Sequence, residues 1–323
     1  MREIYADIGD FMIYSLLPVD HVDVTVLVDN YTDLLMVEEI PLISRPILSY
    51  GKTLFAEHGL SFLIKIYSDG KIVTVLMDAG STETALAQNA EILGIDLDEI
   101  SDIAISHGHF DHIGGLFFVL RQSSCRIPVH MHPAAFSMRR KRRPDGTYTD
   151  LPSLRQDEVT HAGGILSLSQ KPSLLLDKKL LLAGEIERTT SFEQGSPVLE
   201  AMEDGAFVRD PFRDDQSLIL HLRDKGLIII SGCAHAGIIN SVLYARKITG
   251  VNNIHAIMGG FHLSGPYFKR IIPDTISALQ ELNPEHIIPM HCTGWEAQVE
   301  ISRALPGAFA LSTVGTTFHF GRE

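Results

Sequence analysis

The sequence predicts an α/β fold in which helices cover β-sheets, and two observations lead to this class. Short runs rich in valine and isoleucine recur along the chain at strand length, and segments with helical periodicity lie between several of them. An early pair of strands followed by strands that alternate with helices is typical of such layered folds. The 323 residues are 45% apolar and 21% charged, which suffices for a hydrophobic core without disulfide bonds.

The predicted strands are bounded mostly by glycine, aspartate, asparagine or proline, which favour turns. Asp69-Gly70 separates the second strand from the third and is the signal of a tight hairpin. In chain order, the predicted strands are 22–28, 61–66, 72–77, 103–106, 217–222, 227–231, 254–258 and 286–290.

Helices are predicted between or after these strands. The first covers 82–93, because Ser81-Thr82 supplies a helix start and Gly94 a helix stop. A second is predicted at 238–248, where apolar residues recur on one helical face. The same periodicity predicts helices at 273–282 and 295–305.

The segment 134–215 differs from the rest of the chain, because it is more polar and contains a basic run at 139–143. Its strand-like pieces, 174–176 and 180–182, are short. We expect a long insertion or lid on a single domain that spans 1–323, rather than an independent domain. The basic run has two interpretations: a solvated loop, or an anion-binding flap over a phosphate-bearing substrate.

Composition excludes several roles. Acidic residues outnumber basic ones by 40 to 27, a net charge of −13, which argues against binding nucleic acid or a membrane surface. The 3 cysteines include no C-x-x-C pair, so we expect free thiols in a reducing compartment. The N-terminus lacks the pattern of a signal peptide, and no run reaches the ~18 apolar residues that span a bilayer. We therefore expect a cytoplasmic protein; composition does not predict its oligomeric state.

The residues that indicate chemistry begin at SHGHFDHIGG, residues 106–115, at the end of a predicted strand. This segment places His107, His109, Asp111 and His112 close together, all of types that bind zinc, iron or manganese. Their spacing lets the first two histidines meet one metal, while Asp111 and His112 point toward a second. The glycines at 114 and 115 let a helix start close to the site.

This H-x-H-x-D-H pattern resembles the metallo-β-lactamase superfamily. The resemblance implies an αββα sandwich with metals bound at the ends of strands. In that family an aspartate in the position of Asp78, after the strand 72–77, supports the metal-binding histidines from outside. His291, in IIPMHCTG after the last predicted strand, matches the family's last metal-binding histidine.

The chain departs from the family's pattern after the strand 227–231. Most relatives have Gly-Asp there, and the aspartate bridges two metals, whereas this chain has Gly232-Cys233-Ala234-His235. Either Cys233 or His235 is the ligand, and we favour His235, because a buried cysteine often acts as a small apolar residue. Most relatives have one further metal-binding histidine before this strand. By residue type alone, the candidates for it are His130, His132 and His161.

The resemblance implies two divalent ions, zinc in the first place, with iron or manganese as alternatives. The expected ligands of the first ion are His107, His109 and His235. The expected ligands of the second ion are Asp111, His112 and His291. Asp111 would also orient the nucleophile.

Further segments resemble a subgroup whose members include an archaeal synthase that joins a dihydropterin diphosphate to an aminobenzene ribosyl phosphate. These segments are EHGLSF (57–62), GCAHAGIINSV (232–242), MGGFHL (258–263) and HCTG (291–294). In phosphodiesterase relatives a histidine in the position of His262 contacts the scissile phosphate, so we expect His262 to act in catalysis. His58 and Asn30 are candidates for substrate contact, and Arg188 with the basic run is a candidate for phosphate binding.

These residues lead to three hypotheses about function. The first is a metal-dependent hydrolase of a phosphate- or diphosphate-bearing small molecule, with metal-activated water as the nucleophile. The second is a transferase like the archaeal synthase, in which the lid excludes water. The third is a metal-bearing metabolite sensor without turnover. The expected partner is in each case an anionic small molecule.

Overall fold

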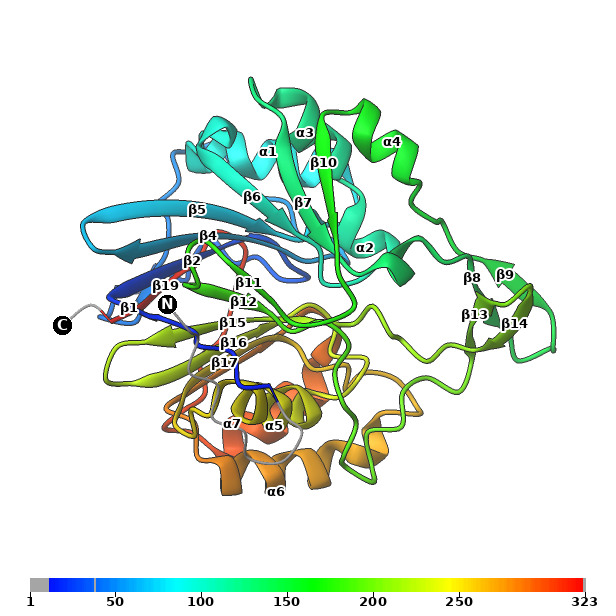
Figure 1. The fold of residues 1–323 in the computed structure, drawn as a ribbon. Coiled ribbons are helices and arrows are strands. Elements are labelled where there is room, and N and C mark those ends of the chain that lie inside the picture. The colour runs from blue at the N-terminus through cyan, green and yellow to red at the C-terminus, as the bar shows by residue number, and fades with distance from the viewer. Residues whose placement is uncertain (1–11, 38, 322–323) are drawn as a thin grey trace, which may run out of the picture.

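The computed structural model describes residues 12–37 and 39–321. Two β-sheets lie face to face, and helices cover the outer side of each sheet (Figure 1). The predicted α/β class and the αββα sandwich are confirmed. The order of layers follows from the burial of both faces of each sheet, since one face meets the other sheet and the opposite face meets helices.

The first sheet has eight strands in the order β10-β7-β6-β5-β4-β2-β19-β3. Strands β4 and β5 form the hairpin predicted at Asp69-Gly70, where both residues have positive φ angles, 54° and 72°. The strands of this sheet are β2 (His21–Val28), β3 (Ile43–Ser44), β4 (Ser61–Ser68), β5 (Lys71–Met77), β6 (Ile100–Ala104), β7 (Ile127–Met131), β10 (Gly164–Leu168) and β19 (Thr317–Phe320).

The second sheet has seven strands, six of them in the order β11-β12-β15-β16-β17-β18, while β1 pairs with β15. Strand β17 runs parallel to both of its neighbours, so the carboxyl ends of β16, β17 and β18 reach one edge of the sheet. The strands are β1 (Pro18–Val19), β11 (Ser173–Leu175), β12 (Leu180–Leu182), β15 (Ser217–Leu222), β16 (Gly226–Ser231), β17 (Ile254–Gly260) and β18 (His286–Met290).

The four helices predicted with bounds, 82–93, 238–248, 273–282 and 295–305, lie close to those bounds. Helix α1 (Glu83–Leu93) begins after Thr82, whose side chain accepts a hydrogen bond from the Ala85 N–H, and ends at Gly94 with φ 66°. Helices α5 (Ile238–Thr249), α6 (Ile272–Leu282) and α7 (Trp295–Ala304) cover the second sheet (Figure 1). The others are α2 (Phe110–Ile113), α3 (Leu116–Gln122) and α4 (Gln156–His161), and the 3₁₀ helices are η1 (Leu97–Glu99), η2 (Pro133–Phe136), η3 (Lys269–Ile271) and η4 (His291–Thr293).

The prediction for 103–106 was wrong in its bounds. Strand β6 ends at Ala104, because the Ser106 N–H donates to a carboxylate oxygen of Asp78 instead of to a neighbouring strand. The helix predicted at Gly114 is also different. Helix α2 begins earlier, at Phe110 inside the histidine motif, and Gly115 caps the separate helix α3.

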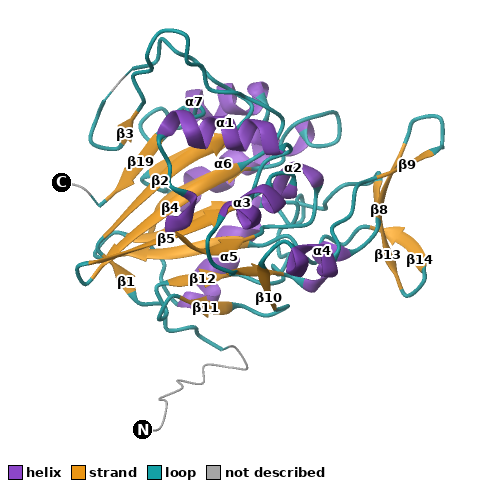
Figure 2. Cartoon of the chain, turned by 90° about the horizontal axis from the view of Figure 1, so that it is seen from above, coloured by secondary structure: helices purple, strands orange, loops and turns teal. Residues whose placement is uncertain are grey.

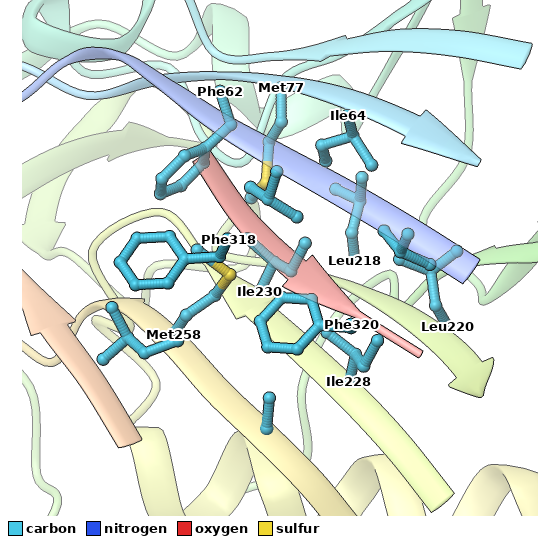
Figure 3. Close-up of a cluster of buried hydrophobic side chains, with 14 of the residues drawn as sticks. Phe62, Ile64, Met77, Leu218, Leu220, Ile228, Ile230, Met258, Phe318 and Phe320 are labelled. Atoms are coloured by element: carbon cyan, nitrogen blue, oxygen red, sulfur yellow. The ribbon is translucent and has the colours of Figure 1, made fainter. Parts of the chain in front are cut away.

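The hydrophobic core between the sheets fixes how their strand ends meet (Figure 3). Strands β4 and β5 contribute Phe62, Ile64 and Met77, and the second sheet contributes Leu218, Ile228 and Ile230. Phe318 and Phe320 from β19 fill the space between them and are fully buried. Each such side chain contributes roughly 1.5–3 kcal/mol by leaving water, so the core holds the two edges in register.

A separate four-stranded sheet, in the order β14-β13-β8-β9, projects from one end of the sandwich (Figure 2). We call this sheet the flap; its strands are β8 (Arg139–Arg142), β9 (Tyr148–Asp150), β13 (Leu199–Glu203) and β14 (Ala206–Arg209). The segment 134–215 thus supplies the flap, but its strands β10, β11 and β12 pair with the main sheets.

Within the described residues, no helix is both long enough and apolar enough to cross a membrane.

Candidate metal centre

Histidine, cysteine and aspartate side chains from both sheets meet where the strands end. Asp78 follows β5, the H-x-H-x-D-H motif follows β6, and the segment 232–235 follows β16. His262 follows β17, and His291 follows β18. Because parallel strands end at a common edge, residues that are far apart in the sequence come together in one cluster.

Several of these turns hold non-glycine residues in the left-handed region. The φ angles are 58° at Asp78, 55° at Ala234, 49° at His262 and 52° at His291. Such conformations cost of order 1–3 kcal/mol each and persist only where the surrounding structure imposes them. Their occurrence at four strand ends around one cluster is typical of a functional site.

The glycines in the motif are required by close packing. A Cβ atom on Gly108 would lie 2.0 Å from the Ala135 carbonyl oxygen, and one on Gly114 would lie 1.9 Å from the Ser81 carbonyl oxygen. At Gly114 the close approach is to the segment that follows β5, and the predicted helix start does not lie there, since α2 already begins at Phe110. The rings of His107 and His112 approach to 4.2 Å between centroids.

Asp78 binds the motif from the outside. One carboxylate oxygen accepts a hydrogen bond from the Ser106 N–H at 2.7 Å. The other accepts from the Ser106 hydroxyl at 2.7 Å and from His112 Nδ1–H at 2.6 Å. Because Nδ1–H of His112 donates to Asp78, the other ring nitrogen, Nε2, points toward the cluster. Nε2 lies 3.2 Å from the Cys233 sulfur.

Cys233 stands at the centre of the cluster. Its sulfur lies within 4.8 Å of ligand atoms of Asp111, His112 and His291, and also within 4.8 Å of ligand atoms of His107 and His235. The sequence leaves open whether Cys233 or His235 faces the metals, and the structure places both side chains in the cluster. Cys233 is the member shared by the two groups.

His235 and His109 face each other, with 3.1 Å between Nε2 of His235 and Nδ1 of His109. The ring of Phe212 stacks on His235 at 4.3 Å between centroids, with 6° between the planes. Asp215 accepts a hydrogen bond from the Ala236 N–H at 2.8 Å and so holds this turn. Burial raises the pKa of Asp215 to about 7.

The unpaired nitrogens of the cluster fit a bound metal. Nε2 of His107 and Nε2 of His291 are buried and have no hydrogen-bond partner within the described residues, and both histidines belong to the candidate metal groups. A buried polar atom without a partner costs about 1–3 kcal/mol, which coordination of a cation would recover. Nitrogen, sulfur and carboxylate donors together suit zinc or another first-row divalent ion.

Electrostatics favours the metal-binding forms of several groups. Burial lowers the pKa of His107 and of His235 well below the usual value. Burial, together with the charge of Arg139, lowers the pKa of His109 to about 3. These imidazoles are therefore neutral and keep a free lone pair. Burial opposes the ionised form of Asp111, but the positive charges of His112 and His291 outweigh burial and lower its pKa.

His112 behaves differently from the other histidines. Burial lowers its pKa, but the charges of Asp78 and Asp111 outweigh burial and raise the pKa to about 9. Without a metal, His112 is thus protonated at neutral pH. A metal that binds Nε2 must displace this proton, so metal uptake and proton release are coupled.

His291 is held by the turn that follows β2. Asn30 donates from its side-chain amide to the His291 carbonyl oxygen at 3.0 Å, and its amide oxygen lies 3.3 Å from His291 Nδ1. Asp29 accepts the His291 N–H at 3.0 Å, and burial raises the pKa of Asp29 to about 6. Asn30 was predicted as a substrate contact, and the structure shows that it orients His291, a metal-binding candidate.

His58 and His262 lie at the rim of the cluster. Nε2 of His58 is 3.4 Å from an Asp111 carboxylate oxygen, and its side chain is 62% exposed. The ring of His262 is 4.2 Å from that of His235. His262, Cys233 and Cys292 form a third group whose ligand atoms lie within 4.8 Å of one another.

Arg188 does not join the cluster. Its guanidinium donates to the Pro211 carbonyl oxygen at 2.9 Å, and Arg188 lines a separate hollow with Glu185 and Phe212. The basic run is also divided. Arg139 is buried in ion pairs with Asp210 at 2.8 Å and Asp214 at 2.6 Å, whereas Lys141 faces a cavity above the cluster.

The further histidines lie elsewhere. His130 pairs with Asp102 at 2.8 Å on the first sheet, the Nδ1 atom of His132 accepts from the Ala134 N–H, and His161 is exposed at the end of α4. None of these three belongs to the candidate metal groups found within the described residues.

Two cavities open from the cluster and share His235 and His262. The flap cavity lies over Asp111 and His291 and is bordered by Lys141, Leu151 and Leu199. The aromatic cavity is bordered by Phe192, Phe261, Tyr267, Phe268 and Arg209. The cluster therefore contacts two binding volumes of different chemistry.

Comparison with known proteins agrees with this geometry. The family model of the metallo-beta-lactamase superfamily matches residues 56–230, and the chain belongs to that superfamily. The chain is 36% identical over 256 residues to 7,8-dihydropterin-6-methyl-4-(beta-D-ribofuranosyl)-aminobenzene-5'-phosphate synthase of Methanocaldococcus jannaschii, covering 77% of this chain and 85% of that protein. An uncharacterized protein of the same organism is 31% identical over 255 residues, with 78% and 90% covered.

Solved structures share the fold. Tm1679, described as a metal-dependent hydrolase of the beta-lactamase superfamily, superposes with a TM-score of 0.69 at 26% identity, covering 92% of this chain and 98% of that chain. YhfI from Bacillus subtilis, a metallo-beta-lactamase fold protein, has a TM-score of 0.50 at 12% identity, with 93% and 100% covered. The latter likeness shows the fold alone.

Sequence reasoning missed several residues that shape the cluster. Asp29 directly follows a predicted strand, and Asp214-Asp215 precedes another with only Gln216 between, so acidic residues near strand ends were the available signal. Cys292 lies in the segment HCTG, which was the available signal for it. No sequence signal marked Phe212, because it acts through contact with His235, which is distant in the chain.

Proposed function

We propose that this protein is a metal-dependent transferase that joins a dihydropterin diphosphate to an aminobenzene ribosyl phosphate. The observation that supports this proposal is the pair of cavities that meet at His235 and His262. A reaction that joins two large molecules needs two binding volumes at one reacting centre, since both partners must be held in contact. The name of the synthase to which the chain is 36% identical describes such a joined product.

The side chains that would hold two divalent ions are those of the cluster. His107 and His235 would bind the first ion, together with His109, whose Nδ1 lies 3.1 Å from Nε2 of His235. Asp111, His112 and His291 would bind the second, and Cys233 belongs to both groups of ligand atoms. Zinc suits these donors, and iron and manganese are the alternatives. The chemistry that such ions supply is neutralisation of the charge on diphosphate oxygens.

The residues of the chain would carry out the remaining steps. The nitrogen of the arylamine attacks the methylene carbon of the dihydropterin, and the bond from that carbon to the diphosphate oxygen breaks. Asp111 stays ionised and orients the amine by accepting its N–H. His58, 3.4 Å from Asp111 and exposed, takes the proton that the amine loses. His262, which borders both cavities, stabilises the departing diphosphate.

The flap would bind the phosphate tail and exclude water. Lys141 brings a positive charge to the flap cavity, and Leu151 and Leu199 border the same volume with apolar side chains. A transferase needs such a cover, because water would otherwise compete with the amine for the same carbon.

A product assay tests the proposal. The metal-loaded protein is incubated with dihydropterin diphosphate and the aminobenzene ribosyl phosphate, and products are separated by liquid chromatography. We expect the joined product and diphosphate in equal amounts. Formation of only the pterin alcohol and diphosphate would exclude the transferase.

Two variants separate metal binding from catalysis. His107→Ala is expected to lower metal content and activity together, because the imidazole is a proposed ligand. His262→Ala is expected to lower activity while metal is retained, because His262 lies outside the two proposed ligand sets. Loss of metal from His262→Ala would contradict its proposed role.

A second candidate is a hydrolase of a phosphate- or diphosphate-bearing small molecule. It is favoured by the likeness to Tm1679, described as a metal-dependent hydrolase, at a TM-score of 0.69. In that case a metal-activated water replaces the amine. Activity against a phosphoester panel without any arylamine would support the hydrolase, and no turnover by metal-loaded protein in either assay would support a metabolite sensor.

A further inference from the structure

The aromatic cavity differs in chemistry from the flap cavity. Its border combines four aromatic rings, those of Phe192, Phe261, Tyr267 and Phe268, and its charged side chains are those of Glu193 and Arg209, apart from the two shared histidines. Tyr267 is 52% exposed, so its ring is available at the opening. Flat, apolar walls with few charges suit a planar ring rather than a flexible, highly charged chain.

The aromatic wall leads directly to the cluster. The ring of Phe268 meets that of His262 edge to face at 4.4 Å, and His262 packs against His235 at 4.2 Å. A ring lying against Phe268 would therefore place a substituent at its edge next to the two shared histidines. This is where the bond between carbon and diphosphate oxygen must break in the proposed reaction.

Arg209 holds a fixed position at the border of this cavity. Its Nη2 donates to the carbonyl oxygens of Gln194 at 2.6 Å and Gly195 at 3.3 Å, and its Nε donates to that of Ser196 at 3.2 Å. Three carbonyl contacts keep the guanidinium plane in one orientation, so a hydrogen bond from it to a ring oxygen or nitrogen costs little entropy.

The wall at 192–195 is held by helix α5. The carboxylate of Glu193 accepts the N–H groups of Ile239 and Asn240, both at 2.9 Å. Asn240 in turn accepts the N–H groups of Thr189 and Thr190 at 2.8 and 2.9 Å. The cavity is thus formed in advance, and a ring that enters it does not have to order the loop.

We propose that the aromatic cavity binds the fused heteroaromatic ring of the dihydropterin, and that the flap cavity takes the aminobenzene ribosyl phosphate. This assignment rests on the proposed function and deepens it. The rings of Tyr267 and Phe268 stack with the pterin, and the fixed guanidinium of Arg209 donates to its ring oxygen or nitrogen. The ribosyl phosphate goes to the other cavity, because Lys141 provides a cation there for its phosphate.

The test measures how tightly 7,8-dihydropterin, the ligand without its diphosphate, binds to the metal-loaded protein. Binding is monitored by the fluorescence of the dihydropterin. Stacking on an aromatic side chain is worth about 1–3 kcal/mol, a factor of roughly 5 to 150 in Kd. We expect Phe268→Ala and Tyr267→Ala each to weaken binding by about tenfold. Tyr267→Ala serves if Phe268→Ala does not fold, since Tyr267 is largely exposed.

The matched control is Phe110→Ala in the flap cavity, where the ring is 41% exposed. We expect this variant to bind dihydropterin as tightly as the unaltered protein and to raise the KM for the aminobenzene ribosyl phosphate. The reverse pattern would overturn the assignment. In that pattern Phe110→Ala weakens the binding of dihydropterin, and the two aromatic-cavity variants raise the KM for the aminobenzene ribosyl phosphate. Unchanged dihydropterin binding in both aromatic-cavity variants would also overturn it.

Product formation, measured in parallel, separates this inference from the proposed function. A joined product from the unaltered protein, together with normal dihydropterin binding by Phe268→Ala and Tyr267→Ala, refutes the cavity assignment alone. Dihydropterin binding that depends on these two side chains, but no joined product, supports the cavity and overturns the transferase. No measurable binding of dihydropterin at millimolar concentration overturns the cavity assignment.

Discussion

The clearest prediction concerns Asp78, which supports the cluster from outside through Ser106 and His112. In Asp78→Asn the new amide oxygen still accepts the Ser106 N–H that Asp78 accepts at 2.7 Å. The amide NH₂ then faces His112 Nδ1–H, so two donors oppose each other where a bond of 2.6 Å stands now. His112 must either lose this hydrogen bond or move its proton to Nε2, the nitrogen proposed to bind metal.

The size of the effect follows from these contacts. Loss of a supporting carboxylate typically lowers metal affinity 10–100-fold, or about 1.4–2.8 kcal/mol. The buried His112 donor left without an acceptor costs about 1–3 kcal/mol of folding stability. Metal affinity is measured by competition with a chelator, and stability by urea unfolding of protein stripped of metal.

The matched control is Asp102→Asn. Asp102 makes the same kind of pair with His130, 2.8 Å between Nε2 and Oδ1, but on the first sheet outside the candidate metal groups. Asp102→Asn should lose some stability and keep wild-type metal affinity. Equal metal affinities for Asp78→Asn and Asp102→Asn would refute the reasoning, because loss of the hydrogen bond from Asp78 to His112 would then have no specific effect on metal binding.

Three further predictions follow from packing and charge. Gly114→Ala should lower the free energy of unfolding in urea by about 1–3 kcal/mol, because its Cβ would lie 1.9 Å from the Ser81 carbonyl oxygen. Gly307→Ala is the control, because its Cβ would meet nothing within 4 Å. Equal losses in the two variants would contradict this reasoning. Arg139→Met should cost about 3–5 kcal/mol in urea unfolding, because it leaves the carboxylates of Asp210 and Asp214 without their cation in the interior. Arg155→Met, which removes an exposed ion pair with Asp157, should cost under about 1 kcal/mol, and an equally small loss in both variants would contradict this reasoning. In metal-free protein the protonated form of His112, whose pKa is raised to about 9, stabilises the fold. This stabilisation, at most about 3 kcal/mol in urea unfolding, is fully present below the unfolded pKa of 6.5 and should disappear as pH rises from 6.5 to 9. It should be smaller in Asp78→Asn, where the charge of Asp111 still raises the pKa; an unaltered slope in that variant would be the contrary result.

Local features of the fold could be predicted because their causes lie within a few residues. The hairpin at Asp69-Gly70 needs only two residues that tolerate positive φ, and α1 needs only a capping Thr82 and a terminating Gly94. The H-x-H-x-D-H motif is equally local, since β6 presents its four ligand-type residues on one turn.

Errors arose where a local pattern is overruled by a distant partner. Strand β6 stops at Ala104 because a carboxylate 28 residues away, that of Asp78, takes the Ser106 N–H. The strands β10 and β12 join the main sheets by pairing with β7 and β15. No property of the segment 134–215 itself indicates these pairings.

The sequence by itself determined the layered class, most of the strands and helices, and the type of chemistry at the motif. The reason is that hydrophobic periodicity, turn residues and metal-ligand residue types are all properties of short stretches of chain. Tertiary structure decided which side chains share one cluster. It placed Cys233 between the two proposed ligand sets, buried Arg139 while leaving Lys141 at the flap cavity, and separated Arg188 from the histidines. These outcomes depend on how two sheets pack around a common core, and that packing brings together residues that no short segment of the chain contains.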